Sequence, residues 1–244
     1  MPSLSLPDRL IWFAHCPKTG GTSIEQVMVA TWGSAVGHLH WGWDRWWRSG
    51  GWRVADPPNS PQHLIWQDAI VQLPRVPNAI FAVVRDPVAR LSSEYRWQRR
   101  GRRGTRAGTL LAWLPFPLWL RLMLAVARRA PHAFDNHLRP QADFVPHTAT
   151  VFRLEDGLEP VADWLAAATG CPLPAVALPH AIPTGQAALV RASDAARIGA
   201  AFAVDYARFG YIPPDGRVPS RDVLDWVADR LAIPVAALDR RGRL

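Results

Sequence analysis

The residues with the clearest potential for chemistry form a run of small, basic and hydroxyl-bearing side chains, Pro-Lys-Thr-Gly-Gly-Thr-Ser, at positions 17–23. Gly20 and Gly21 allow the backbone to turn tightly and to come close to an anion. One ammonium group and three hydroxyl groups add donors for the oxygens of such an anion: Lys18, Thr19, Thr22 and Ser23. This combination of residue types predicts a phosphate-binding loop. The alternative is a tight turn that binds nothing.

Lys18 stands out because it is the only lysine in a chain whose other strongly basic residues are all arginine. A lysine carries a compact point charge, whereas arginine presents a planar fork of donors. The choice of lysine at this one position suggests that a point charge is needed there.

Two elements must position the loop. Leu10 to Ala14 is an uninterrupted apolar run, which predicts a buried strand, and a helical pattern extends from Ile24 to Trp32. A strand that leads through a glycine loop into a helix brings an anion to the helix N-terminus, where the backbone N–H groups and the helix dipole favour negative charge. The nucleotide-triphosphate pattern Gly-x-x-x-x-Gly-Lys-Ser/Thr does not fit, because Lys18 precedes the glycines.

A second polar group follows a second apolar run. Residues 78–84 predict another buried strand, and Asp86 and Pro87 are a good N-cap and first residue for a helix that reaches about Arg99. Arg85 is therefore expected at the carboxyl end of a strand, the edge of a parallel sheet where ligands bind, with Ser93 two turns into the helix. An arginine fork suits a phosphate group and a serine hydroxyl can reach a further oxygen. The alternative is an ion-pairing arginine and an ordinary helix serine.

Both motifs resemble those of the sulfotransferases that use 3′-phosphoadenosine 5′-phosphosulfate (PAPS), especially the Golgi carbohydrate sulfotransferases and their bacterial relatives. Residues 17–23 resemble the 5′-phosphosulfate loop, and Arg-Asp-Pro-Val-Ala-Arg-Leu-Ser-Ser-Glu-Tyr, residues 85–95, resembles the 3′-phosphate-binding segment. The resemblance covers roughly residues 8–211, and the motifs are about 60 residues apart, as in that family. It implies a P-loop-like α/β fold, in which a central parallel sheet is flanked by helices and carries a mostly helical insertion. The donor-binding residues that it implies are Lys18, Thr19, Gly20, Gly21, Thr22, Ser23, Arg85 and Ser93.

The resemblance also implies a reaction, the in-line transfer of a sulfuryl group from PAPS to a hydroxyl of a carbohydrate or glycolipid-type acceptor. By analogy with phosphoryl transfer, the protein supplies positioning and charge stabilisation, with Lys18 neutralising charge on the bridging oxygen and the sulfuryl group. This scheme demands no metal, and we expect none.

A hydroxyl acceptor needs a base. The histidine candidates are His15, His38, His40, His63 and His137. The related 6-O-sulfotransferases place their catalytic histidine between the two phosphate motifs, ahead of the second strand, and His63 matches that place. The 2-O-type members use a histidine nearer the first helix, where this chain has His38 and His40. Glu25 or Asp68 is the carboxylate alternative. We take His63 as the predicted base.

Length and composition suit one α/β domain of 244 residues. Its expected parts are a core of about 8–211, an insertion of about 101–135, and a C-terminal helix and basic tail over 212–244. The formal charge of +8 favours a polyanionic ligand, nucleic acid or an anionic membrane face, although arginine richness can also reflect coding bias. Two cysteines and a start directly in the first strand favour a reducing, cytoplasmic location without a signal peptide or a structural metal.

The most apolar segment, residues 110–127, contains Pro115, Pro117 and Arg121, which argue against a transmembrane helix. Arginines flank it on both sides, so that residues 99–129 could lie in a membrane interface. A core helix or a substrate lid fits the same pattern, and the sequence does not decide among the three.

Two further regions are candidates for acceptor binding. A crowd of tryptophans among arginines could form an acceptor platform or simply cover a long loop: Trp41, Trp43, Trp46, Trp47 and Trp52 with Arg45, Arg48 and Arg53. Residues 136–141 resemble a segment of bacterial and chondroitin-type members, which suggests that His137 and Arg139 line the acceptor cleft. A glycan, a glycolipid and a small alcohol all fit such a cleft.

The remaining pattern predicts a short helix opened by His63, a strand over 150–154, and helices over 158–168, from 193 towards 202, and over 220–231. Two other function classes stay open. A P-loop-type small-molecule kinase needs a lysine after the glycines. A non-catalytic arginine-rich membrane or nucleic-acid binder leaves the two matched motifs unexplained. We therefore expect a PAPS-dependent sulfotransferase that binds no nucleic acid.

Overall fold

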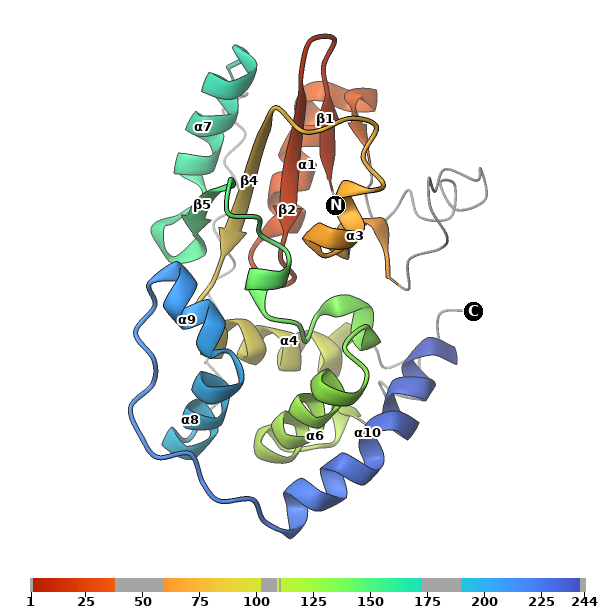
Figure 1. Cartoon of the computed structure of the whole chain (residues 1–244), viewed down its shortest axis with the longest axis vertical. Coiled ribbons are helices and arrows are strands. Elements are labelled where there is room, and N and C mark those ends of the chain that lie inside the picture. The colour runs from red at the N-terminus through yellow and green to blue at the C-terminus, as the bar shows by residue number, and fades with distance from the viewer. Residues whose placement is uncertain (1, 38–58, 102–108, 110, 173–189, 242–244) are drawn as a thin grey trace. The chain divides into compact units, whose positions relative to one another are not determined.

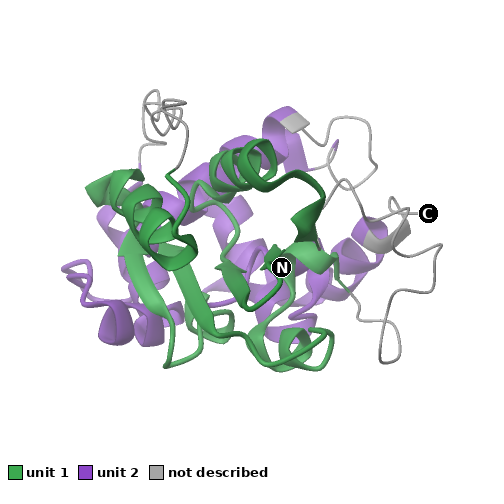
Figure 2. Cartoon of the chain, turned by 90° about the horizontal axis from the view of Figure 1, so that it is seen from above, with its two compact units in different colours: residues 1–85, 141–183 green, residues 86–140, 184–244 purple. Residues whose placement is uncertain are grey.

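The computed structural model describes residues 2–37, 59–101, 109, 111–172 and 190–241 (Figure 1). By its packing the chain divides into two compact units, each made of two stretches of sequence. Unit 1 comprises residues 1–85 and 141–183, and unit 2 comprises residues 86–140 and 184–244 (Figure 2). Each unit has its own hydrophobic core.

Unit 1 is built on a five-stranded mixed sheet with the order β3-β1-β2-β4-β5. Its strands are β1 (Ser3–Ser5), β2 (Leu10–His15), β3 (Val36–Gly37), β4 (Ala79–Val84) and β5 (Thr150–Arg153). The pairs β2–β4 and β4–β5 are parallel, which confirms the predicted parallel core. The pairs β1–β2 and β1–β3 are antiparallel. A tight turn between β1 and β2 reverses the chain at the first of these pairs.

The two faces of this sheet are covered by different helices (Figure 1). Alternate residues of a strand point to opposite faces. Ile11 and Phe13 of β2 share a core cluster with residues of α1 (Gly21–Trp32) and α7 (Glu159–Thr169). Trp12 faces the other way and meets Trp66 of α3 (Trp66–Ile70), with ring centroids 4.9 Å apart. Because both faces are covered, β2 and β4 are nearly continuous apolar runs.

The predicted elements of unit 1 are confirmed with one correction. Helix α1 begins three residues earlier than its apolar pattern indicated, directly at Gly21. Helix α7 ends where expected, with Gly170 in the left-handed conformation at its C-cap. His63 does not open a helix, however. It is the last residue of a 3₁₀ turn, Pro61–His63, and α3 begins only at Trp66, because Leu64 and Ile65 are extended.

Unit 2 is helical. Its helices are α4 (Pro87–Gly101), α6 (Phe116–Arg129), α8 (Ala192–Ala201), α9 (Ala203–Phe209) and α10 (Val223–Arg241). Asp86 caps α4 as predicted, because its Oδ1 accepts a hydrogen bond of 2.8 Å from the N–H of Ala89. Helix α9 was not predicted as a separate element. Helix α10 extends ten residues beyond the predicted end at Leu231 and passes through Pro234.

The structure decides the nature of the apolar segment near residue 120. Helix α6 starts after Pro115 and buries Phe116, Trp119 and Met123, among others, in the core of unit 2. The apolar residues that suggested a membrane contact there are therefore mostly core residues. Among the described helices, none combines the length and the apolar character that crossing a bilayer requires.

Candidate functional site

The predicted loop is held in a backbone conformation that most residues avoid. Lys18 has a positive φ of 69°, and Gly20 at the N-cap of α1 has φ 85° and ψ 7°. For glycine this is free of strain, but for a lysine it costs on the order of 1 kcal/mol or more and persists only where the surroundings enforce it. The surrounding fold therefore holds the loop in this conformation.

Thr19 and Gly20 show how the loop is fastened. The hydroxyl of Thr19 is fully buried and donates a hydrogen bond of 2.8 Å to the carbonyl of Cys16. Gly20 lies against Leu154, so that a Cβ at this position would be 3.0 Å from Cδ1 of that leucine. In this structure the Thr19 hydroxyl stabilises the loop. The predicted contact of Thr19 with an anion would therefore be made by its backbone N–H, and it stays a prediction.

Helix α1 offers a positive end to the loop. Within the described residues no side chain caps its N-terminus, and its first turn holds no acidic residue. Thr22 is exposed and Ser23 is half-buried, while the N–H of Ser23 is 3.1 Å from the carbonyl of Gly20. The helix dipole therefore favours an anion at this end, and no neighbouring carboxylate in the first turn opposes it.

Arg85 is brought to the same loop. His15 of β2 pairs with Val83 of β4 in parallel register, so that the two strands end side by side. The Nη1 of Arg85, which follows β4, is 3.4 Å from the carbonyl oxygen of Lys18. The two motifs that lie far apart in the sequence thus meet at the carboxyl edge of the sheet, as the sequence predicted for Arg85.

A residue that the sequence reasoning missed, Gln141, holds Arg85 in place. Its side-chain amide is fully buried and makes two hydrogen bonds of 2.8 Å with the backbone of Arg85. The carbonyl oxygen of the amide accepts from the N–H of Arg85, and the NH₂ group donates to the Arg85 carbonyl. The only available signal is the position of Gln141 at the end of the 136–141 segment, in which the sequence suggests an acceptor-cleft role for His137 and Arg139 only.

Behind the loop, a histidine, a glutamate and a glutamine form one buried cluster, which we call the first triad: His15, Glu25 and Gln62. The Nδ1 of His15 is 2.7 Å from Oε1 of Glu25, and Nε2 of Gln62 donates to the same oxygen at 2.6 Å. His15 ends β2, and Glu25 lies one turn into α1. The triad therefore joins the strand to the helix that flanks the loop.

The first triad touches the loop directly through Gly21. A Cβ built on Gly21 would be only 1.9 Å from Nε2 of His15, so no side chain fits between the imidazole and the start of α1. The other side of the imidazole stacks on Phe13, with ring centroids 5.1 Å apart. The ring of His15 is thus clamped between the core and the loop.

The pKa of Glu25 is set by burial and by its polar partners, which act in opposite directions. Burial by itself would raise the pKa of this carboxyl, but the charge of His15 and hydrogen bonds from His15 and Gln62 outweigh it and lower the pKa below its usual value of 4.5. Glu25 is therefore an acceptor that orients its neighbours. This argues against its alternative role as a base, because a depressed pKa makes a carboxylate a weaker base.

His63, the predicted base, lies next to the first triad. Its ring meets that of His15 edge to face, with centroids 5.1 Å apart and planes at 65°. The side chain is 8% exposed, and the backbone N–H bonds to the carbonyl of Ser60 at 3.0 Å. The structure thus groups two of the histidine candidates, His15 and His63, which the sequence had treated separately.

The other candidates are distributed as follows. His137 and Arg139 belong to unit 2, where Nδ1 of His137 is 2.7 Å from Oε2 of Glu94. Ser93 is half-buried on α4, and its predicted contact with a phosphate stays a prediction. Asp68 is half-buried on α3. His38, His40 and the tryptophan-rich stretch lie outside the described residues.

A family model described as the sulfotransferase family matches residues 4–155, which is more than half of the 244 residues. The match includes the loop, the first triad, Arg85, Ser93 and Gln141. A search of curated proteins and a search of solved structures each found no significant match.

Proposed function

Because the chain belongs to the sulfotransferase family, we propose that it transfers a sulfuryl group from PAPS to a hydroxyl of a carbohydrate or glycolipid-type acceptor. The single observation that supports this most is the approach of Arg85 to the Lys18 loop, 3.4 Å from Nη1 to the carbonyl oxygen. PAPS carries two anionic groups, and two basic motifs at one sheet edge fit such a donor.

In this proposal the donor is held by two sets of residues. Backbone N–H groups from Thr19 to Ser23 and the dipole of α1 bind the 5′-phosphosulfate, and Arg85 with Ser93 binds the 3′-phosphate. Lys18 stabilises the charge that develops between the 5′-phosphate and the sulfuryl group. Its left-handed backbone conformation supports this role, because strained residues persist where a site requires their direction.

His63 acts as the base. As the acceptor oxygen forms its bond to sulfur, the bond from sulfur to the 5′-phosphate oxygen breaks, and the hydroxyl proton passes to His63. The first triad positions His63 through the ring contact with His15. We expect His63→Ala to lower kcat by about 10² to 10⁴, measured as the transfer of radiolabelled sulfate from PAPS to a panel of glycans, glycolipids and alcohols.

The donor site is tested first by thermal unfolding with 3′-phosphoadenosine 5′-phosphate, the product nucleotide, beside ADP and Mg-ATP. Ligand at about 100 times its dissociation constant adds roughly 2.7 kcal/mol of stability. We expect a rise in Tm with the 3′-phosphorylated nucleotide alone, lost in Arg85→Ala and kept in Arg75→Ala, which removes an exposed arginine elsewhere in unit 1. A rise with Mg-ATP alone would refute the proposal in favour of a kinase.

A further inference from the structure

Helix α10 in unit 2 buries its small apolar side chains and exposes its large ones. Its buried face carries small apolar residues, Ala228, Ala232, Val235 and Ala236. Its large apolar side chains are instead between 39% and 75% exposed, and we call them the outer face of α10: Val223, Leu224, Trp226, Val227, Leu231 and Ile233. A helix of a water-soluble surface shows the opposite distribution. The outer face therefore needs an explanation.

These side chains form one continuous surface. Residues four apart on a helix lie one above the other, so Val223, Val227 and Leu231 make a single row. Leu224 widens the row on one side, and Trp226 widens it on the other. Exposed apolar residues that are contiguous in this way mark interaction sites, whereas scattered ones do not.

Ion pairs on the inner side fix the rotation of α10 about its axis. Asp225 is buried and lies 3.3 Å from Nε of Arg121 and 3.1 Å from Nη1 of Arg197. At the other end of the helix, Oδ2 of buried Asp239 accepts a hydrogen bond of 2.9 Å from the N–H of Phe134. Turning the outer face inward would break these contacts and leave buried charges without partners, which costs several kcal/mol.

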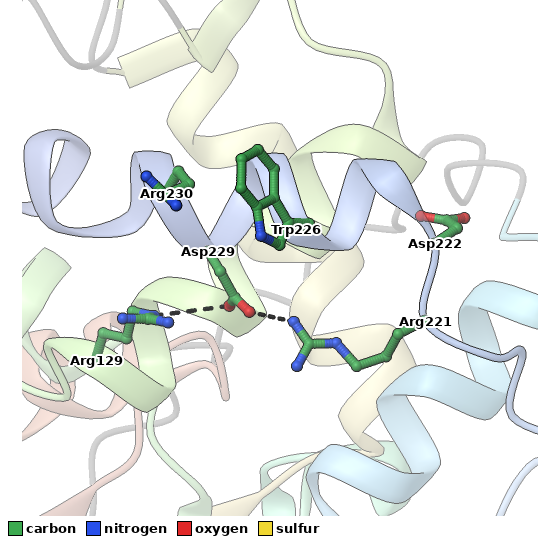
Figure 3. Close-up of a pocket in the computed structure, with 6 residues that line it drawn as sticks. All are labelled: Arg129, Arg221, Asp222, Trp226, Asp229 and Arg230. Atoms are coloured by element: carbon green, nitrogen blue, oxygen red, sulfur yellow. Dashed lines mark hydrogen bonds and ion pairs between the residues drawn. The ribbon is translucent and has the colours of Figure 1, made fainter.

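A cavity of about 420 Å³ adjoins the outer face and shares Trp226 with it (Figure 3). Asp229 lies between Arg129 and Arg221, and the guanidinium of Arg230 lies 4.5 Å from the centroid of the Trp226 ring. The cavity thus combines an indole and three arginines with two aspartates, Asp222 and Asp229, so its lining has a net positive charge. An excess of arginine beside an apolar surface suits a phosphate group next to apolar chains.

Charge around the outer face is strongly unbalanced. Five arginines on or beside α10 share three aspartates: Arg121, Arg128, Arg129, Arg197 and Arg221 with Asp222, Asp225 and Asp229. Arg230 lies over the Trp226 ring, and the remaining aspartate of α10, Asp239, is buried. Asp229 alone contacts Arg128, Arg129 and Arg221, so it cannot neutralise them. The sequence adds three more arginines at positions 240, 241 and 243, and the whole chain carries +8. The excess positive charge favours an anionic partner.

We propose that the outer face of α10 docks on an anionic phospholipid membrane. The apolar row enters the headgroup and upper acyl region while Arg129, Arg221 and Arg230 bind lipid phosphates, as expected for a helix that lies in the interface plane. Trp226 suits this boundary because one side of its ring system is apolar and its N–H is polar. The alternative occupant, a second copy of the chain, would bring two arginine-rich surfaces face to face.

This inference does not depend on the proposed sulfuryl transfer, since every residue that supports it lies in unit 2 and none belongs to the donor site. It can be tested with the full chain by flotation on two kinds of vesicle, neutral phosphatidylcholine and phosphatidylcholine mixed with phosphatidylglycerol. We expect binding to the anionic vesicles only, and weaker binding as the salt concentration rises.

Two pairs of double variants separate the apolar and the basic contributions. Val227→Glu/Leu231→Glu should lower the partition coefficient at least tenfold, while Val71→Glu/Val76→Glu, an equal charge change at exposed valines of unit 1, should leave it within about twofold of the wild type. Arg129→Gln/Arg230→Gln should remove most of the preference for anionic vesicles, which the exposed control Arg75→Gln/Arg191→Gln keeps. Thermal unfolding checks that each variant is folded.

Several outcomes would overturn the proposal. The first is equal binding of the wild type to neutral and anionic vesicles, and the second is no binding to either. The third is an equal loss of vesicle binding in the α10 variants and in their controls. Light scattering covers the remaining case. A dimer that Val227→Glu/Leu231→Glu converts to a monomer, without vesicle binding by the wild type, would assign the outer face to a second copy.

Discussion

The two units contain the same small polar arrangement in different surroundings. The first triad, His15 with Glu25 and Gln62, lies in unit 1. A second triad, His137 with Glu94 and Gln98, lies in unit 2. In both, Nδ1 of the histidine is 2.7 Å from the glutamate, and the glutamine amide donates to that glutamate, at 2.6 Å in the first and 2.7 Å in the second.

The neighbours of the two histidines differ. His15 lies against Gly21 at the start of the anion-binding loop. The ring of His137 lies against that of Trp97, tilted by 32°. The second triad continues in the helical core, where the indole N–H of Trp119 donates to Gln98 at 2.8 Å. The same three residue types can thus brace a binding loop or a core. What decides between these roles is the group that lies against the imidazole.

The second triad also stabilises an unusual backbone. Three consecutive residues that are not glycine, at positions 134–136, have φ between 53° and 62° and lead directly into His137. Fully buried Arg90 donates to the carbonyls of His137 and Arg139, at 3.1 and 2.8 Å. This segment is strained by several kcal/mol in total, and the contacts from α4 must offset that strain.

We therefore expect the largest loss of stability from Glu94→Ala. Removing the carboxylate leaves Nδ1 of His137 and the amide of Gln98 buried without their partner, at a cost of about 3–5 kcal/mol in the free energy of unfolding. Urea denaturation measures the loss, and Glu94→Gln, which preserves shape and an acceptor, should cost less. A loss below about 1 kcal/mol for Glu94→Ala would show that the second triad does not brace unit 2.

Gly21→Ala should act through the first triad. Its Cβ would be 1.9 Å from Nε2 of His15, so the imidazole or the loop must move, at a cost of about 1–3 kcal/mol. In contrast with Glu94→Ala, the main result should be loss of the Tm rise with 3′-phosphoadenosine 5′-phosphate. Gly37→Ala is the control, because its Cβ would meet Ser3 at an ordinary 3.6 Å. Unchanged ligand binding in Gly21→Ala would contradict the coupling of triad and loop.

The pH dependence of stability distinguishes the first triad further. A carboxyl whose pKa is lowered in the folded state contributes stability above its unfolded pKa, near 4.5 here, and loses it as the pH falls through the folded pKa. The wild type should therefore be more stable than Glu25→Gln at pH 6–7, and the gap should shrink below about pH 4.5. Free energies of unfolding at several pH values test this, and a constant gap down to pH 3 would be inconsistent with it.

The sequence predicted the features that are local in the chain. Apolar runs located β2 and β4, and Asp86 with Pro87 marked the start of α4, because strand burial and helix capping depend on neighbours within a few residues. The loop motif was recognisable for the same reason. The left-handed conformation of Lys18 was not, because nothing in its type or its neighbours indicates a positive φ for lysine.

Features that join distant residues escaped prediction. Gln141 binds Arg85 across 56 positions, and Gln62 binds Glu25 across 37, which no local pattern reports. For α10 the pattern indicated an amphipathic helix but not which side faces the core, since buried Asp225, paired with two arginines, reverses the usual orientation. The helix also continues through Pro234, which is exposed, although proline usually interrupts a helix.

The smallest effect that we predict concerns how the loop is fastened, independently of either triad. Thr19→Val keeps the shape of the buried side chain but removes the hydrogen bond of 2.8 Å to the Cys16 carbonyl, which should cost about 1 kcal/mol. Thr19→Ser keeps the hydroxyl and should restore most of the Tm. If Thr19→Val kept the Tm and Thr19→Ser lowered it, the methyl group, and not the hydroxyl, would be what stabilises the loop.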